Sequence, residues 1–487
     1  MSAELLVNVA AGETRAALLE DGRLQELTIE RADHACMVGN LYKGRVVRVL
    51  PGMQAAFVEV GLARTGFLHA GDVGAARRTA AVAAEQAPIQ SLLAQGDEIL
   101  VQVIKDAINS KGARLSGQLS LPSRLLVYLP AGSGVGISAR IDAPAERERL
   151  RGLMAQLASA VPGGGYIVRT AAEGASAEQL AADVQYLQRL WQHVRARHAT
   201  ARAGTLLHEE LSLPLRLLRD EPLEPVQRIC VDSEAVFERL RAFATQFMPQ
   251  ALPRLQHHPG PEPLFDLHGV EAQIEAALER RVELACGGYL VIDQCEALTG
   301  IDVNTGAFVG GDDLEQTSLR TNLEAAREIA RQLRLRNIGG IIVIDFIDME
   351  IEAHRQQLLA EFQAALAADR VRSQIAGVSS LGLVEMTRKR TRESLGQLLC
   401  VPCSACDARG FHQGAESVAR ALCREVLRRI RPEVPRPAAV LAHPQVIDWL
   451  QTSGTALLAQ LSQALGRPLQ LTVEAHSTVE HYEIVYG

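Results

Sequence analysis

An uninterrupted apolar run, Gly339–Ile344, leads directly into Asp345-Phe346-Ile347-Asp348. Such a run is typical of a β-strand that is buried on both faces. Upstream, Gly300–Val303 is predicted as a strand, and Thr317–Arg336 carries leucine and alanine at helical spacing. Strand, amphipathic helix and buried strand make a βαβ unit, so we expect an α/β domain of the catalytic type in this region.

Acidic residues close both strands of this unit. In an open α/β sheet, the side chains at the carboxyl ends of strands line the crevice where ligands bind, so Asp302 and Asp345 are expected near one another. Two close carboxylates repel unless a cation lies between them, and Mg prefers one or two carboxylates together with waters and phosphate oxygens. Such a site can activate water and neutralise phosphoryl charge. Asn304 shares the face of Asp302 and could hydrogen-bond the reacting phosphate or its attacking water.

A structural alternative places the same residue types at these positions, because Asp and Asn are common at strand-end turns and helix N-caps. Spacing alone leaves both interpretations open. The chain has no Gly-x-x-x-x-Gly-Lys-Ser/Thr, no His-Glu-x-x-His and no Gly-x-Ser-x-Gly, which argues against P-loop, zinc-peptidase and α/β-hydrolase chemistry.

Length and composition narrow the class of protein. The 487 residues correspond to about three or four domains of ordinary globular composition. No stretch approaches the roughly 18 apolar residues of a membrane helix, and the first residues lack the pattern of a secretory signal. Eight Cys, some within apolar runs, indicate reduced thiols in a cytosolic compartment. The net charge of −7 excludes a uniformly basic nucleic-acid coat but leaves room for a local basic groove.

Short strands dominate the first 120 residues. A hairpin is predicted over Glu4–Val9, Thr14–Leu19 and Leu24–Ile29, with a turn at Asp21-Gly22. Five strands then suit a small barrel of the OB type, with residues 74–95 as a long loop or short helix. These strands are Tyr42–Leu50, Ala55–Val60, Thr65–Ala70, Glu98–Lys105 and Ala113–Gly117.

Two aromatic residues fall on the polar side of the barrel strands. Alternation places Phe57 with Glu59 and Phe67 with His69. An aromatic side chain there can stack on an unpaired base, which contributes about 1–3 kcal/mol. Alternatively, one or both Phe pack under the long loop. Positive charge nearby in sequence comes from Lys43, Arg45, Lys105 and Lys111.

The strand that ends in Arg169-Thr170 follows three glycines and could hold a phosphate through its guanidinium and hydroxyl groups. A Gly-rich hairpin with a surface Arg is the structural alternative. Helices are predicted over Ala175–Arg197 and Val270–Ala285, the second ending in a C-cap at Gly287-Gly288, before the strand Tyr289–Asp293.

Three thiols lie close in sequence at Cys400, Cys403 and Cys406. A Cys-x-x-Cys pair suits half of a tetrahedral zinc site, so two chains could share one zinc. An iron–sulfur run and a redox dithiol are alternatives. The basic run 388–392 before them is either a solvated helix face or a contact to a phosphate backbone.

Six segments that occur in one order connect these features. They are Tyr42–Arg45, Pro51–Val58, Arg169-Thr170, Ile301–Gly306, Asn337–Met349 and Leu383–Arg390. With them the chain closely resembles, over essentially its whole length, the ribonuclease E/G family of bacterial endoribonucleases.

The resemblance implies an α/β multidomain protein. An RNase H-like domain, split into residues 1–38 and 214–278, would contain an inserted OB-fold RNA-binding barrel (39–120) and a 5′-phosphate sensor (121–213). A DNase I-like catalytic domain (279–399), a zinc link (400–412) and a small C-terminal α/β domain (413–487) would follow.

By motif match, Asp302 and Asp345 would bind catalytic Mg, and Asn304 would orient substrate or water. The implied activity is hydrolysis of single-stranded RNA to 5′-phosphate and 3′-hydroxyl ends, in ribosomal RNA 5′-end maturation and messenger decay. A non-catalytic RNA-binding scaffold is the alternative function.

The other implied sites serve binding. Single-stranded RNA would be held by Phe57, Phe67, Lys111 and Arg372. The 5′-monophosphate end that activates such enzymes would be bound by Arg169 and Thr170.

Zinc would be shared between chains of a homodimer, or of a tetramer, through Cys403 and Cys406. The family usually has Pro directly after the first zinc Cys, where this chain has Ser404. The sequence ends at Gly487 without the long scaffold tail of some members, so degradosome assembly is not implied.

Overall fold

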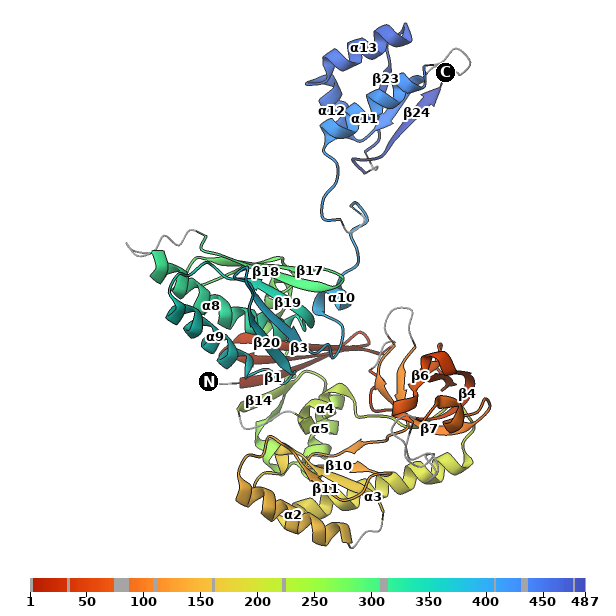
Figure 1. Cartoon of the computed structure of the whole chain (residues 1–487), viewed down its shortest axis with the longest axis vertical. Helices are drawn as coiled ribbons and strands as arrows, with labels where there is room; N and C mark the ends of the chain where they lie inside the picture. Colours follow the sequence, from red (N-terminus) through yellow and green to blue (C-terminus); the bar gives the residue numbers. More distant parts are fainter. Residues whose placement is uncertain are drawn as a thin grey trace. The chain divides into compact units, whose positions relative to one another are not determined.

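The computed structural model has a mixed α/β architecture (Figure 1). It divides the chain into two compact units, Met1–Leu395 and Gly396–Gly487. None of the described helices combines the length and apolar character that a bilayer-spanning helix requires. The structure describes residues 3–32, 36–73, 87–107, 112–159, 163–220, 225–306, 314–406, 409–430, 437–475 and 478–486.

The first sheet of unit one combines two distant segments of sequence. The predicted hairpin strands are confirmed as β1 (Ala3–Ala10), β2 (Glu13–Glu20) and β3 (Arg23–Arg31). Strands β14 (Val226–Val231) and β15 (Leu255–His257) add parallel to β1, in the order β15-β14-β1-β2-β3. The helices that follow or pack near this sheet are α4 (Leu213–Asp220), α5 (Glu234–Phe247), α6 (Leu264–Leu267) and α7 (Val270–Ala276).

The predicted barrel is confirmed as a closed five-stranded sheet. Its strands are β4 (Leu41–Leu50), β5 (Ala55–Glu59), β6 (Gly66–His69), β7 (Glu98–Lys105) and β8 (Arg114–Ser116). Pairing of β4 with β7 closes the ring, and β13 (Thr205–His208) adds to β4 from outside. The interval predicted as a loop or short helix contains α1 (Ile89–Leu92), and its residues 74–86 lie outside the described part.

A third sheet has the order β11-β12-β10-β9. Its strands are β9 (Leu121–Pro122), β10 (Leu126–Leu129), β11 (Val135–Ile137) and β12 (Gly165–Val168). Helices α2 (Pro144–Ser159) and α3 (Ala177–Thr200) accompany it, and α3 confirms the helix predicted for this region. Ser176 and Gln179 form a reciprocal capping box that fixes where α3 begins.

The fourth sheet carries the predicted βαβ unit. Its order is β16 (Arg281–Glu283), β17 (Tyr289–Gln294), β18 (Leu298–Asn304), β19 (Gly340–Asp345), β21 (Val384–Arg388), β20 (Ser373–Val378). Helix α8 (Leu314–Leu335) connects β18 to the parallel strand β19, and α9 (Glu352–Leu366) packs beside α8 (Figure 1). Both helices contribute to one apolar core together with Ile301, Ile342 and Ile344.

The prediction that Gly339–Ile344 is buried on both faces is wrong. Ile342 and Ile344 are fully buried, whereas Ile341 on the opposite face is 53% exposed. The core residues of α8 and α9 pack against one face of the sheet, which leaves the other face open. An apolar run therefore does not distinguish a strand that is buried on both faces from a strand with one face exposed to solvent.

The helix predicted over Val270–Ala285 is also wrong beyond its first two turns. Helix α7 ends at Ala276, and Arg281–Glu283 pairs antiparallel with Tyr289–Val291 as strand β16. Gly287 and Gly288 form the hairpin turn, since Leu284 and Gly288 are joined by a backbone hydrogen bond of 2.8 Å. Cross-strand pairing here overrides helix propensity.

Unit two begins within α10 (Leu395–Leu399) and contains a three-stranded sheet. The strand order is β23 (Gln470–Val473), β22 (Pro437–Ala442), β24 (Tyr482–Tyr486). Helices α11 (Ala415–Arg428), α12 (Pro444–Gln451) and α13 (Thr455–Leu465) share its apolar core.

Candidate active site

Asp302 and Asp345 are direct neighbours across two parallel strands. In the register of β18 and β19 they are paired with each other, and both are exposed on the open face of the sheet. Neighbouring strands lie about 4.8 Å apart, so the two side chains emerge side by side. The structure thus brings together the two acidic residues that the sequence predicted to be close.

Alternation along the strands explains why both carboxylates reach solvent. In β18, Ile301 and Val303 point into the core, so Asp302 between them points outward. In β19, Ile342 and Ile344 point inward, and Asp345 is the next residue on the outer side after Val343. The same apolar residues that fix the register therefore also fix the acidic pair.

The charge of this pair is not compensated within the described residues. Burial raises the pKa of the Asp345 carboxyl above its usual value, and the negative charges of Asp302 and Asp348 raise it further. None of these three carboxylates has a Lys or Arg ion-pair partner in the described part of the chain. A cation placed between Asp302 and Asp345 would relieve this repulsion.

Asn304 extends the acidic pair by one further polar group. Its Nδ2 donates a hydrogen bond of 2.8 Å to Oδ2 of Asp302, which fixes the orientation of that carboxylate. Both residues lie on the open face because they are two positions apart in one strand.

The loop after Asp345 is fastened to helix α8 by residues that the sequence analysis missed. Asn322, fully buried, donates to the Ile347 carbonyl at 2.7 Å and accepts from the Ile347 backbone N–H at 3.0 Å. Glu315 accepts from the backbone N–H groups of Glu350 and Ile351 at 3.1 Å. The available signal was an Asn on the buried face of a helix, where a polar residue needs a specific partner.

The donor set at Asp302 and Asp345 fits Mg²⁺. This ion is commonly held by one or two carboxylates and completes its shell with waters and substrate oxygens. The described residues contain no group of three or more His, Cys, Asp or Glu that could hold a metal by itself. Two carboxylates on an open face therefore suit a hydrated ion that shares its ligands with a substrate, rather than an ion enclosed by protein.

Phe57 and Phe67 lie opposite each other on β5 and β6. Their ring centroids are 6.2 Å apart with an interplanar angle of 71°, and both side chains are partly exposed. Glu59 and His69 on the same face are exposed, so the face predicted to be polar reaches solvent. Two aromatic surfaces are thus presented together on one side of the barrel.

The basic residues expected beside these rings behave differently from one another. Lys43 and Arg45 both pair with Glu98, at 3.0 and 3.1 Å, so this carboxylate compensates one of their two positive charges. Lys105 is exposed, and Lys111 lies outside the described residues.

Arg169 lies between two acceptors at the end of β12. Its Nη1 donates to the Ser123 carbonyl at 2.7 Å, and its Nη2 lies 2.8 Å from Oδ1 of Asp220. The exposed hydroxyl of Thr170 lies 3.1 Å from that of Ser138. Arg169 and Thr170 are adjacent and accessible, but the guanidinium is already engaged on two of its nitrogens.

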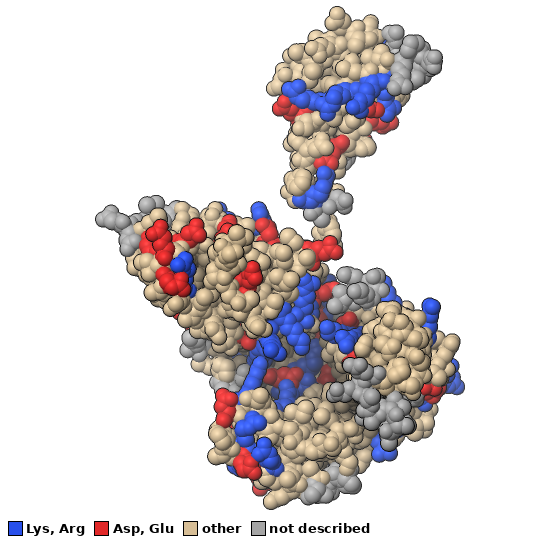
Figure 2. All heavy atoms as spheres, viewed as in Figure 1, with Lys and Arg blue, Asp and Glu red and all other residues tan. Residues whose placement is uncertain are grey.

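Arg372 is exposed and lines an open groove of about 510 Å³ with Lys389 and Arg390. The groove lies at the start of β19, beside Gly340 and Ile341, and so at the opposite end of that strand from Asp345. In Figure 2, Lys and Arg side chains of unit one gather in the hollow at the middle of the drawn face.

The basic run 388–392 is not a helix face. Arg388 ends β21 and is buried in an ion pair of 2.6 Å with Asp369. Arg390 donates to the Gly339 carbonyl, and Arg392 donates to the Leu27 carbonyl. The run is therefore partly structural, because its arginines satisfy backbone carbonyls of neighbouring segments.

The thiols of unit two are free. Cys403 is exposed, and its pKa is lowered by the backbone N–H groups of Ala405 and Cys406 and by the Cys406 side chain. A thiol close to a second thiol and to backbone donors is suited to bind a metal as thiolate. Two such ligands make half of a tetrahedral zinc site.

Comparison with known proteins adds an independent observation. The sequence profile of the Ribonuclease E/G family matches residues 120–391. The chain is similar to ribonuclease G of Escherichia coli K12, with 46% identity over 491 aligned positions that cover the whole of both chains. It is 43% identical to ribonuclease G of Haemophilus influenzae over 99% of both chains. It is 42% identical to ribonuclease E of a Nostoc species over 81% of this chain and 57% of that protein.

Proposed function

The chain belongs to the ribonuclease E/G family and is an endoribonuclease, and from this premise we propose that it hydrolyses single-stranded RNA at Asp302 and Asp345 with the help of Mg²⁺. The observation that carries the proposal is the pairing of the two carboxylates across β18 and β19 on the open face of the sheet. An extended polymer can reach them there without entering a closed pocket.

Asp302 and Asp345 would hold the ion, and Asn304 would keep Asp302 in position through its 2.8 Å hydrogen bond. Bound Mg²⁺ supplies activation of water and neutralisation of phosphoryl charge. Asn322 and Glu315 keep the loop after Asp345 in place, so that this carboxylate need not reorganise when RNA arrives. Because water is the nucleophile, the reaction would not need the 2′-hydroxyl of the RNA. Water would attack phosphorus and the P–O3′ bond would break, so that the 3′-oxygen leaves and the products carry 5′-phosphate and 3′-hydroxyl ends.

The RNA strand would be held on either side of the cut. Phe57 and Phe67 present two π-faces for stacking on unpaired bases, and the exposed Lys105 adds positive charge to the barrel. Lys111 is proposed beside them by motif match alone. Arg372 would contact the backbone from its groove.

A short fluorescent single-stranded RNA tests the activity. We expect cleavage in Mg²⁺ and none in EDTA, with 5′-phosphate on the downstream product. Intact RNA under both conditions, with binding retained, would favour the alternative function of a non-catalytic RNA-binding scaffold.

Arg169 and Thr170 are proposed to bind the 5′-terminal monophosphate of the substrate. Arg169→Ala should reduce the preference for 5′-monophosphorylated over 5′-hydroxylated RNA by about tenfold, since it removes one charge-assisted contact. The cleavage rates of matched RNAs that differ only at the 5′ end measure this preference. Thr65→Ala, in an exposed residue of the β5–β6 turn of the barrel, is the control. An unchanged preference in Arg169→Ala would show that Arg169 and Thr170 have a purely structural role.

Cys403 and Cys406 are proposed to give two of the four ligands of a zinc ion shared by two chains. We expect about one zinc per two chains in a homodimer, and a dimer that loses zinc and dissociates on Cys403→Ser. Metal analysis with analytical ultracentrifugation measures both. Full dimerisation of Cys403→Ser without zinc would refute the link.

We propose the cellular compartment and the processes served from the family to which the chain belongs. All eight cysteines are free thiols, which suits a reducing bacterial cytoplasm. We propose ribosomal RNA 5′-end maturation and messenger decay as the processes served. The OB-fold, RNase H-like and DNase I-like relationships of the barrel, first sheet and fourth sheet are proposed on the same basis.

A further inference from the structure

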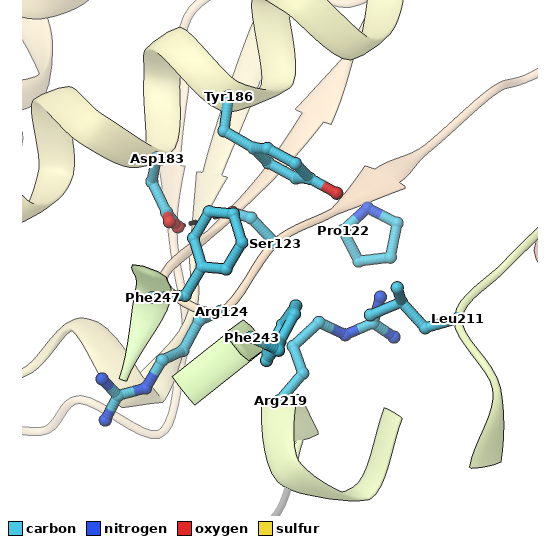
Figure 3. Close-up of a pocket in the computed structure, with 9 residues that line it drawn as sticks. All are labelled: Pro122, Ser123, Arg124, Asp183, Tyr186, Leu211, Arg219, Phe243 and Phe247. Atoms are coloured by element: carbon cyan, nitrogen blue, oxygen red, sulfur yellow. Dashed lines mark hydrogen bonds between the residues drawn. The ribbon is translucent and has the colours of Figure 1, made fainter. Parts of the chain in front are cut away.

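The first acceptor of the Arg169 guanidinium, the Ser123 carbonyl, lies in a turn that buried hydrogen bonds hold in place. Asp183, in helix α3, is 7% exposed and accepts from the Ser123 hydroxyl at 2.5 Å and the Leu125 backbone N–H at 2.8 Å. Figure 3 shows this carboxylate beside Ser123 at the edge of a small cavity, with Arg219 on the other side. The clamped turn presents the Ser123 carbonyl that holds Nη1 of Arg169 at 2.7 Å.

The second acceptor of Arg169 is the Asp220 carboxylate, in an ion pair that is partly exposed to solvent. Nη2 of Arg169 lies 2.8 Å from Oδ1 of Asp220, and the two side chains are 27% and 35% exposed. A ligand can therefore reach the guanidinium at the place where the carboxylate is bound.

Asp220 does not depend on Arg169 to remain in place. Arg219 holds both of its oxygens, through Nε at 3.0 Å and Nη2 at 2.9 Å. Arg219 is itself buried and paired at 2.7 Å with buried Glu210. If a ligand took Nη2 of Arg169, Asp220 would keep its stronger partner, so the exchange costs only one partly exposed contact.

Asp220 remains ionised in this arrangement. Burial alone would raise its pKa, but the hydrogen bonds and charges of Arg219 and Arg169 hold the pKa below its usual value. The negatively charged Asp220 carboxylate thus faces the Arg169 guanidinium, which is proposed to bind the 5′-terminal phosphate.

We propose that Asp220 is a specificity-determining residue that competes with RNA phosphates for Arg169, so that a terminal phosphate monoester displaces it and an internal phosphodiester does not. This inference rests on the phosphate-binding role proposed for Arg169. A terminal monoester carries close to two negative charges near pH 7, because its second pKa is about 6. An internal phosphodiester carries one negative charge. It therefore gains little free energy by replacing the Asp220 carboxylate, which also carries one negative charge.

Asp220→Asn tests the competition because the amide keeps the shape and loses the charge. The affinities of 5′-phosphorylated and 5′-hydroxylated forms of one short RNA, labelled at the 3′ end, are measured by fluorescence anisotropy in magnesium-free buffer. We expect the 5′-hydroxylated RNA to bind about fivefold more tightly than to the parent protein, the size of one near-surface charge interaction. The 5′-phosphorylated RNA should bind at least as tightly as before but gain less than about fivefold, so the ratio of affinities falls.

The control is Glu361→Gln, which removes the charge from a carboxylate of similar exposure, 34%, paired at 2.6 Å with Arg327 on helices α8 and α9. It should leave both affinities unchanged.

Two outcomes would overturn the inference while leaving the phosphate-binding role intact. In one, Asp220→Asn leaves both affinities unchanged; in the other, it weakens 5′-phosphorylated RNA, as expected if Asp220 merely supports Arg169. In both cases Arg169→Ala still reduces the preference by about tenfold. If Arg169→Ala keeps the full preference, the phosphate-binding role fails and the competition fails with it.

Discussion

Asp345→Asn should lower the rate of RNA cleavage by about a thousandfold or more, while RNA binding stays within about threefold of the parent protein. The amide preserves the shape of the side chain but removes one of the two charges that would hold Mg²⁺ beside Asp302. We propose that binding is carried by other surfaces, foremost the Phe57–Phe67 pair of the barrel. Single-turnover cleavage and fluorescence anisotropy measure the two quantities separately.

Asp293→Asn is the matched control for this prediction. Asp293 lies on β17 and shares the open face of the sheet with Asp302, because Val291, two positions earlier, is paired with Asp302. Its charge is already compensated by Arg280, which contacts both of its oxygens at 2.5 and 2.6 Å. We expect near-parent cleavage from Asp293→Asn, and near-parent cleavage from Asp345→Asn would falsify the assignment of the active site.

Asp345→Asn should leave the fold intact. Asp345 is exposed and has no ion-pair partner among the described residues, so neutralising it removes repulsion from Asp302 and Asp348. We expect a thermal unfolding midpoint equal to or slightly above that of the parent protein. Loss of activity with a lowered midpoint would point to damage rather than to chemistry.

Replacing both Phe57 and Phe67 by Ala should weaken binding of single-stranded RNA by about a hundredfold. Each ring can contribute about 1–3 kcal/mol by stacking on a base, so tenfold per ring is a moderate expectation. The rings are partly exposed and pack on each other at 6.2 Å, so the barrel core beneath them is not opened.

Phe57→Leu separates stacking from packing in this pair, because it keeps apolar bulk and removes the π-face. We expect Phe57→Leu to bind RNA as weakly as Phe57→Ala, whereas Phe57→Tyr should retain most of the affinity. Parent-like binding by Phe57→Leu would show that the ring only fills space over the strand.

The placement of the acidic pair could be predicted from the sequence because it depends on local rules. A strand, a helix and a second strand give parallel neighbours, and acidic residues at both strand ends then meet. The Phe57–Phe67 face followed in the same way from alternation over two short strands. In both cases the deciding information lies in the order of residues within one unit.

Other features depend on contacts that no local pattern encodes. The exposed face of β19 could not be predicted because an apolar run does not reveal that Ile341 is 53% exposed. Strand β16 lies where a helix is predicted because its residues can form either structure, and pairing with β17 decides between them. Neither error changed the parallel pairing of β18 with β19, on which the positions of Asp302 and Asp345 depend.

Charge compensation was the least predictable property. Lys43 and Arg45 are basic in sequence but share Glu98, more than 50 positions away, and so contribute one net positive charge instead of two. The pairing of Arg169 with Asp220 likewise joins β12 to the end of α4. Such ion pairs require the three-dimensional arrangement of segments that are distant in the chain.

The binding of Mn²⁺, as a spectroscopic substitute for Mg²⁺, tests most directly whether Asp302 and Asp345 share one ion. Electron paramagnetic resonance counts bound Mn²⁺ without requiring activity. We predict that Asp302→Asn, Asp345→Asn and the double variant each bind one Mn²⁺ fewer per chain than the parent protein, and all to the same extent. Parent-like stoichiometry in either single variant would contradict a shared ion and, with it, the active site proposed on this sheet.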